Sequence, residues 1–348
     1  MKNMGREISA VDLFCGAGGL THGLIKSKIN VVAGFDIEKS CKFAYEKNNK
    51  GAKFLHQDVS TLTAEELKGL YPKGHIKLLA GCAPCQPFST YSQGRDVRND
   101  KKWPLLYEFA RLIRQVKPEL VTMENVPDVI KHEVYHDFVL ELEGMGYHVW
   151  ADAVYCPDYG IPQSRTRHVL LASKLGPVEI VKPTHKQSAY KTVADTIFSL
   201  PAIAAGESDP LDPLHKSSAL SPLNLQRIRA SEPGGSWWSW PEELRAACHR
   251  KSSGRSYSGV YARMSWDQPS PTMTTQCYGY GNGRFGHPEQ DRAISLREAA
   301  LFQTFPRKYQ FVPKGSKVEM TPIGKMIGNA VPVRLGTIIG RSLLRQVI

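Results

Sequence analysis

The chain has 348 residues, of which 41% are hydrophobic and 22% are charged, a composition that excludes a disordered or collagen-like protein. No apolar run approaches the ~20 residues of a membrane helix, and the polar, basic start Met1–Glu7 excludes a secretory signal. Forty-five basic and 33 acidic side chains give a net charge of +12, and residues 181–348 carry nearly all of the excess. A localised basic region is typical of a nucleic-acid partner, the alternative being a basic solvated surface.

The seven cysteines are few and odd in number for this length. This number argues against a disulfide framework and for a reducing compartment. We therefore expect a cytoplasmic protein.

Strand-like and helix-like segments alternate through the first 180 residues. In the run 105–117, for example, apolar side chains recur at the spacing of one helix face. Strands are expected at Ile8–Phe14, Asn30–Asp36, Phe54–Gln57, Ile76–Gly81, Leu120–Met123, Tyr147–Val154 and His168–Ala172, the last two antiparallel. Helices are expected from the turn 16–19 to about Lys26, at Glu38–Asn48, Ala64–Leu70 and 105–117, and from Val134 to about Gly144. The alternation predicts an α/β fold with a doubly wound, mostly parallel sheet, helices on both faces, and functional loops at the carboxyl ends of the strands.

The composition and the periodicity of the sequence change after residue 180. Pro, Ser and Gly become frequent from 181 to 290, and helical periodicity weakens. We expect a smaller, irregular domain here, with helices returning at Ser295–Phe302 and Val333–Leu344.

A glycine-rich turn, Phe14-Cys15-Gly16-Ala17-Gly18-Gly19, follows the first strand and opens a helix. Glycines let a ligand approach the backbone, and a helix N-terminus offers free N–H groups. Asp36 closes the second strand, where nucleotide-type sites bind ribose hydroxyls, and Asp58 closes the third. Although the spacing is neither the dinucleotide motif nor a P-loop, these features favour an adenosine-containing cofactor. The alternative is a tight structural turn with two helix-capping aspartates.

The segment Gly81-Cys82-Ala83-Pro84-Cys85-Gln86-Pro87-Phe88-Ser89 follows the fourth strand. Cys82 and Cys85 could form a redox pair or half of a zinc site, although no second Cys/His pair stands at zinc spacing. Cys85 alone could be a nucleophile on a stiff turn, or both could be buried small hydrophobes. The motif by itself leaves these alternatives open.

Two further motifs carry charge at strand ends. Glu124 in Met123-Glu124-Asn125-Val126-Pro127 could act as an acid if its pKa is raised, or be an ordinary helix-start carboxylate. Arg165 and Arg167 in Gln163-Ser164-Arg165-Thr166-Arg167 could clamp an anionic backbone or orient a carboxylate, or lie on a solvated edge strand.

Taken together, these motifs give the chain a clear resemblance to the DNA (cytosine-5)-methyltransferases, specifically the compact bacterial and phage type of restriction–modification systems. The resemblance runs over nearly the whole chain, and Ala83 stands where a second Pro or an aromatic residue is common. It rests on Asp12-Leu13-Phe14-x-Gly16-x-Gly18-Gly19, Asp36, Asp58, Pro84-Cys85-Gln86, Glu124-Asn125-Val126, Gln163-x-Arg165-x-Arg167, Arg297-Glu298-x-Ala300-x-x-Gln303-x-Phe305-Pro306 and Gly328-Asn329-Ala330-Val331-Pro332.

The resemblance implies the following roles. Cys85 would add to carbon 6 of cytosine, Glu124 would bind or protonate ring nitrogen 3, and Arg165 and Arg167 would bind the base carbonyl or hold the other two. Cys82 would have only a packing role. The expected cofactor is S-adenosylmethionine, with S-adenosylhomocysteine as product and no metal. Its site would be lined by Phe14, Cys15, Gly16, Ala17, Gly19, Asp36, Ile37, Asp58, Val59, Pro84, Leu105, Asn329 and Val331.

The expected substrate is double-stranded DNA, from which the target cytosine must be flipped out. Ser89–Trp103 would be a loop that closes over this base, and the residues that read base edges would lie in Gly234–Tyr261. The residues expected to contact DNA are Gln86, Ser89, Arg95, Arg98, Arg255, Tyr257 and Arg263. Residues 1–180 and about 321–348 would form the catalytic domain, and about 181–320 the target-recognition domain.

The sequence leaves three alternative functions. A tRNA cytosine-5 methyltransferase shares these motifs, but the long basic insertion favours DNA. A silent DNA-binding regulator would not need Cys85 and Glu124, and a dithiol oxidoreductase would need Cys82. We expect a monomer. Because the first motif begins at residue 12, we expect no N-terminal regulatory domain. A companion endonuclease would be compatible with this type of enzyme.

Overall fold

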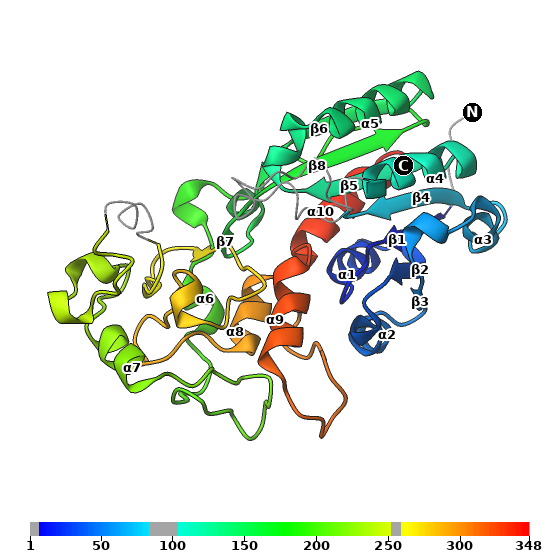
Figure 1. The fold of residues 1–348 in the computed structure, drawn as a ribbon. Helices are drawn as coiled ribbons and strands as arrows, with labels where there is room; N and C mark the ends of the chain where they lie inside the picture. The colour runs from blue at the N-terminus through cyan, green and yellow to red at the C-terminus, as the bar shows by residue number, and fades with distance from the viewer. Residues whose placement is uncertain (1–6, 84–103, 252–258, 348) are drawn as a thin grey trace. The chain divides into compact units, whose positions relative to one another are not determined.

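The computed structural model describes residues 7–83, 104–251 and 259–347. The chain forms two compact units (Figure 1). The first comprises Met1–Tyr159, Thr166–Thr184 and Ala330–Ile348, and the second comprises Gly160–Arg165 and His185–Asn329. No helix in these described ranges is long and apolar enough to cross a membrane.

The first unit is built on a seven-stranded sheet in the order β3-β2-β1-β4-β5-β8-β6. Its strands are β1 Ile8–Leu13, β2 Asn30–Asp36, β3 Lys53–His56, β4 Ile76–Gly81, β5 Leu120–Asn125, β6 His148–Tyr155 and β8 Thr166–Ser173. The strands from β1 to β5 pair in parallel, whereas β8 runs antiparallel to both β5 and β6. The predicted mostly parallel α/β sheet with two late antiparallel strands is confirmed.

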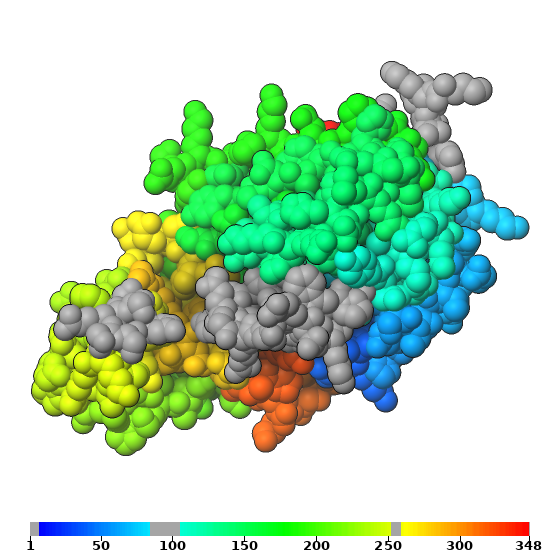
Figure 2. Space-filling model, turned by 45° about the horizontal axis from the view of Figure 1, so that its top comes forward, coloured from blue at the N-terminus to red at the C-terminus, as the bar shows by residue number. Residues whose placement is uncertain are grey.

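Helices cover this sheet on its two faces. They are α1 Gly19–Lys26, α2 Lys42–Asn48, α3 Ala64–Gly69, α4 Pro104–Val116, α5 Glu133–Gly144 and α10 Val333–Leu344. On one face, Leu13 and Met123 of the sheet share a core with Phe109 of α4 and Phe138 of α5, whose rings stack 5.6 Å apart. α4 and α5 form part of the surface drawn in cyan to green in Figure 2.

Helices α1 and α10 pack closely against each other (Figure 1). A Cβ atom added at Gly23 of α1 would lie 2.7 Å from the Cα atom of Gly336 in α10. Because glycine has no side chain, the two backbones can approach this closely. The C-terminal helix is thereby fixed beside the helix that begins at the glycine-rich turn.

The second unit has short elements joined by irregular segments. They are β7 Gln163–Ser164, α6 Val193–Ile197, α7 Pro222–Arg229, β9 Ser270–Pro271, α8 Leu296–Phe302 and α9 Met320–Asn329, with short 3-10 turns between them. One of its cores contains the aromatic side chains Trp237, Trp240 and Tyr280. The sequence pattern indicated this irregular texture but not α6, α7 or α9.

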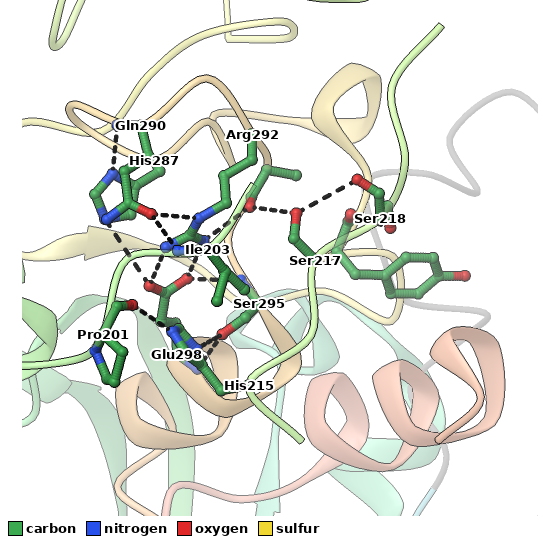
Figure 3. Close-up of polar contacts among 12 residues, drawn as sticks. Pro201, Ile203, His215, Ser217, Ser218, His287, Gln290, Arg292, Ser295 and Glu298 are labelled. Atoms are coloured by element: carbon green, nitrogen blue, oxygen red, sulfur yellow. Dashed lines mark hydrogen bonds and ion pairs between the residues drawn. The ribbon is translucent and has the colours of Figure 1, made fainter. Parts of the chain in front are cut away.

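A buried ion pair between Arg292 and Glu298 lies inside this unit (Figure 3). Arg292 donates to both carboxylate oxygens of Glu298 at 2.8 Å, and the backbone N–H of Ser295 donates to the same carboxylate at 2.6 Å. Nε2 of His287 lies 3.9 Å from Glu298, and its Nδ1 accepts a backbone hydrogen bond from Gln290 at 2.9 Å. Burial lowers the pKa of His287 to about 4, so near neutral pH this histidine faces Glu298 uncharged.

The boundaries of the units differ from the expected ones at two places. Gln163 lies in the second unit because its strand, β7, pairs with β9. The Gln163 side chain donates a hydrogen bond to Oε1 of Gln303 at 2.9 Å and accepts one from the backbone N–H of Met273 at 2.7 Å. The unit also continues past residue 320 through α9. A Cβ atom at Gly328 would lie 2.3 Å from the backbone of Thr274, so α9 packs directly on this unit's own chain.

Candidate active site

The glycine-rich turn leaves β1 in an unusual backbone conformation. Phe14, Gly16 and Gly18 all have positive φ angles of 60°, 51° and 90°, which glycine adopts readily and Phe14 only in a constrained turn. A Cβ atom at Gly19 would lie 2.3 Å from the carbonyl oxygen of Val331, whereas one at Gly16 would meet nothing within 4 Å. The turn is therefore packed against the C-terminal segment on one side and open at Gly16.

Asp36 at the end of β2 is bonded to this turn. Its Oδ2 accepts a hydrogen bond from the backbone N–H of Gly16 at 2.8 Å, and its Oδ1 accepts one from Glu38 at 2.8 Å. Ile37, the next residue, is 66% exposed. The structure thus places Asp36, Ile37 and Gly16 together at the carboxyl ends of β1 and β2, as the sequence predicts.

Asp12 of β1 is a buried carboxylate behind the turn. Oδ2 accepts a 2.6 Å hydrogen bond from the hydroxyl of Thr21, while Oδ1 is buried and has no hydrogen-bond partner in the described ranges. Burial raises the pKa of Asp12 to about 7, opposed by the Thr21 hydrogen bond and helped by repulsion from Asp36. The sequence placed Asp12 in a motif but gave it no role, although a carboxylate in a mostly apolar strand is itself a signal.

The other expected cofactor residues are placed as follows. Asp58 caps the short turn Val59–Thr61, since its Oδ1 accepts a hydrogen bond from Ser60 at 2.9 Å, which matches the capping alternative for this residue. Leu105 lies half-buried near the start of α4. Cys15 is buried, and burial raises the pKa of its thiol. Pro84 lies outside the described residues.

Glu124 and Arg167 form an ion pair at the ends of β5 and β8. Nε of Arg167 lies 3.1 Å from Oε1 of Glu124, and the two side chains are only 13% and 9% exposed. In the antiparallel ladder Glu124 is opposite Val169, so Arg167, two residues away, extends from the same face. Oε1 of Glu124 has no hydrogen bond of good geometry in the described ranges. A half-satisfied, nearly buried carboxylate of this kind is suited to bind another polar group.

Asn125 connects this pair to the segment that carries Cys85. Its Nδ2 donates to the carbonyl oxygen of Ala83 at 3.3 Å, two residues before Cys85. Cys85 itself lies outside the described residues, as do the expected DNA contacts Gln86, Ser89, Arg95, Arg98, Arg255 and Tyr257 and the loop Ser89–Trp103.

Arg165 and Asn329 belong to the second unit. Arg165 is 4% exposed, and its Nη1 donates to the carbonyl oxygen of Met273 at 3.1 Å. This burial differs from the solvated edge strand that was the alternative for the two arginines.

Arg263 does not fit its expected role as a DNA contact. Its side chain is 6% exposed and pairs with Asp291 at 2.5 Å. The guanidinium also donates to the carbonyl oxygens of Ile228, Ser231, His287 and Gln290. Because these bonds use the donors internally, Arg263 holds the unit together and has no face to offer a base or phosphate.

Comparison with known proteins agrees with this architecture. The family model for C-5 cytosine-specific DNA methylases matches residues 8–345. The chain belongs to this family. It is 53% identical over 340 residues to the Type II methylase M.HgiDII of Herpetosiphon aurantiacus, covering 97% of this chain and 95% of the relative. It is 30% identical to the Type II methyltransferase M1.HphI of Haemophilus parahaemolyticus, covering 98% and 87%. The resemblance found in the sequence is thus confirmed, and the chain is a DNA (cytosine-5)-methyltransferase.

Solved structures support the fold. A putative DNA modification methyltransferase encoded in an E. coli prophage superposes with a TM-score of 0.75 at 22% identity, covering 97% of this chain and 99% of that chain. The S. pombe Dnmt2 methyltransferase gives a TM-score of 0.60 at 20% identity, covering 97% and 98%.

Within residues 7–83, 104–251 and 259–347, no group of three or more His, Cys, Asp or Glu is placed to hold a metal ion.

Proposed function

We propose that this methyltransferase acts on a cytosine flipped out of a short, specific sequence of double-stranded DNA, with S-adenosylmethionine as methyl donor. The observation that carries the proposal is the Glu124–Arg167 pair, 3.1 Å apart, beside the asparagine that anchors the Cys85 segment. Glu124 would supply the acid and Arg167 the cation that the reaction requires, and Cys85, which follows Ala83 by two residues in the sequence, would supply the nucleophile.

The end of β1 fits a cofactor of this kind. Gly16 leaves open space beside the turn, and Oδ1 of Asp12 is a buried carboxylate oxygen without a hydrogen bond from the described residues. A carboxylate there would favour a ligand with a positive charge. S-adenosylmethionine carries ammonium and sulfonium charges and, when bound, supplies an electrophilic methyl group. Gly16, Asp36 and Ile37 would hold its adenosine portion.

The chain's own residues would drive the reaction as follows. The Cys85 thiolate adds to carbon 6 of cytosine, which makes carbon 5 nucleophilic. Glu124 provides a proton or strong hydrogen bond at ring nitrogen 3, where negative charge develops. Arg167 keeps Glu124 in position and binds the base carbonyl. After methylation, a base takes the carbon 5 proton, the electrons of that C–H bond form the double bond between carbons 5 and 6, and Cys85 leaves carbon 6 as the thiolate.

The other parts of the proposal concern the surroundings of the reaction. The basic excess of the second half would neutralise DNA phosphates. We place the enzyme as a monomer in the cytoplasm of a bacterial or phage-infected cell, associated with the nucleoid through DNA. A companion restriction endonuclease would suit an enzyme whose relatives are named as Type II methylases and methyltransferases.

The test is expression in a host without cytosine methylation, followed by bisulfite sequencing of that host's DNA. Protected cytosines within one short sequence are expected from the wild type, and none from Cys85→Ser, which should still bind DNA and cofactor. Full protection by Cys85→Ser would overturn the mechanism. Absence of protection by the wild type would contradict the DNA substrate, and methyl transfer to tRNA would then be measured.

A further inference from the structure

A short glycine-rich loop of the second unit, Gly279–Gly286, is anchored at two buried aromatic rings. Tyr280 and Phe285 are each 2% exposed. The hydroxyl of Tyr280 bonds Ser231 at 2.8 Å and donates to the carbonyl oxygen of Tyr261 at 3.1 Å. Backbone hydrogen bonds hold the far end, where the carbonyl of Phe285 accepts from Ile294 at 2.8 Å.

The glycines of this loop lie where no side chain fits. A Cβ atom at Gly281 would lie 2.9 Å from the ring of Tyr261, one at Gly283 would lie 2.6 Å from the ring of Phe285, and one at Gly286 would lie 2.9 Å from the carbonyl oxygen of Ala262. The loop is therefore pressed onto the aromatic core beneath it. Packing on this core fixes its backbone.

Between the two anchors, Asn282 and Arg284 are exposed. Arg284 makes no ion pair and no hydrogen bond with any residue that the structure describes. Two other arginines of this unit are used differently: Arg263 and Arg292 are buried and paired with Asp291 and Glu298. The loop thus displays one uncommitted guanidinium on a rigid support.

We propose that Arg284 is a specificity-determining residue that reads a guanine edge in the major groove of the target DNA; this rests on the proposed function. A guanidinium can donate two parallel hydrogen bonds to O6 and N7 of guanine, which distinguishes guanine from the other bases. A side chain that reads a base must extend from a backbone with a fixed position. The backbone of this loop is fixed by its packing on the aromatic core. A phosphate contact would need only a positive charge.

This assignment places a base-contacting residue outside the stretch Gly234–Tyr261 that the sequence suggested. The sequence signal was the run Gly279-Tyr280-Gly281-Asn282-Gly283-Arg284-Phe285-Gly286, whose alternating glycines are typical of a tight loop. Only the structure distinguishes its buried aromatic anchors from its exposed polar residues.

The experiment compares Arg284→Lys and Arg284→Ala with the wild type in two assays. The first is bisulfite sequencing of a randomised duplex library after methylation, and the second is the salt dependence of duplex binding. Lysine keeps the charge but lacks the rigid planar fork that presents two parallel N–H donors to one base. Both variants are therefore expected to lose about 10- to 100-fold of the preference for guanine at one position of the site, while Arg284→Lys keeps the wild-type salt slope.

Arg307→Ala is the matched control, because Arg307 is also an exposed arginine of the second unit but lies outside this loop. It is expected to leave the sequence preference unchanged. If Arg284→Lys keeps the full preference and Arg284→Ala weakens binding to all sequences equally, Arg284 contacts a phosphate and the inference is wrong. Unchanged behaviour of both variants also overturns it. A wild type that methylates no DNA would refute the proposed function itself, a result distinct from these.

Discussion

Nε of Arg167 lies 3.1 Å from Oε1 of Glu124, across two antiparallel strands whose register puts both side chains on one face of the sheet. Both side chains are almost fully buried, so the pair is shielded from the solvent that weakens surface ion pairs. The arrangement keeps one carboxylate oriented at the edge where the Cys85 segment begins.

We expect Glu124→Gln to lower the methylation rate by about 100-fold or more, because the amide cannot supply a proton to the base. Single-turnover kinetics with a substrate duplex would measure this, and fluorescence anisotropy should show DNA binding within a few-fold of wild type. Glu119→Gln is the control, because Glu119 pairs with Lys77 at 3.1 Å just before the start of β5. A Glu124→Gln enzyme as fast as this control would refute an acid role for Glu124.

Asp12→Asn should stabilise the cofactor-free protein at pH 8 and weaken cofactor binding. The pKa of Asp12 is raised to about 7 in the folded state, so the folded protein holds a proton that the unfolded chain has released above about pH 4. Stability from this group is thus present at low pH and lost as the pH rises through 7. Thermal melts at pH 5 and pH 8 should show a larger gain in Tm for the variant at pH 8 than at pH 5.

Isothermal titration with S-adenosylhomocysteine gives the second readout for Asp12→Asn. The variant is expected to bind at least several-fold more weakly. Unchanged affinity, or a Tm gain equal at both pH values, would count against a buried carboxylate that serves the cofactor.

The second unit should lose stability in acid through two groups that act in the same direction. Burial lowers the pKa of His287 to about 4. Burial opposes the ionisation of Glu298, but Arg292 outweighs it and lowers the pKa to about 2. Both folded values are depressed, so stability present at neutral pH is lost as the pH falls, from about 6.5 to 4 for His287 and from about 4.5 to 2 for Glu298.

Tryptophan fluorescence can follow this transition, since Trp237, Trp238, Trp240 and Trp266 lie in the second unit. His287→Asn should flatten the pH dependence of Tm between 6.5 and 4. Glu298→Gln should destabilise the unit at pH 7 by about 3–5 kcal/mol, because it leaves Arg292 buried without its counter-charge. A Glu298→Gln variant as stable as wild type would show that the pair contributes nothing.

Gly19→Ala should destabilise the first unit by about 2 kcal/mol or more, because the new methyl group would lie 2.3 Å from the carbonyl oxygen of Val331. Gly69→Ala is the matched control, since a Cβ atom at the end of α3 meets nothing within 4 Å. Urea unfolding of the two variants measures the difference. Equal midpoints would mean that the C-terminal segment can shift away from the turn at no cost.

Local patterns were sufficient to predict most of the first unit. Its strands are continuous apolar runs and its helices carry apolar side chains at helical spacing, so β2 and β4 begin and end where the sequence suggested. The motifs therefore placed Asp36 and Glu124 at the carboxyl ends of strands in one sheet. The short, irregular elements of the second unit gave no such periodic signal, and α6, α7 and α9 were not predicted.

The sequence by itself predicted the α/β class and the order of the motifs, because these depend on residue types and on local periodicity, and its resemblance to the family implied the roles proposed for Cys85, Glu124 and Arg167. Only the tertiary structure decided which polar groups are buried and which are exposed. It placed Arg263 in the interior, left an oxygen of Asp12 buried without a hydrogen bond from the described residues, and displayed Arg284 on a packed loop. Burial depends on packing between residues far apart in the chain, and no local pattern encodes it.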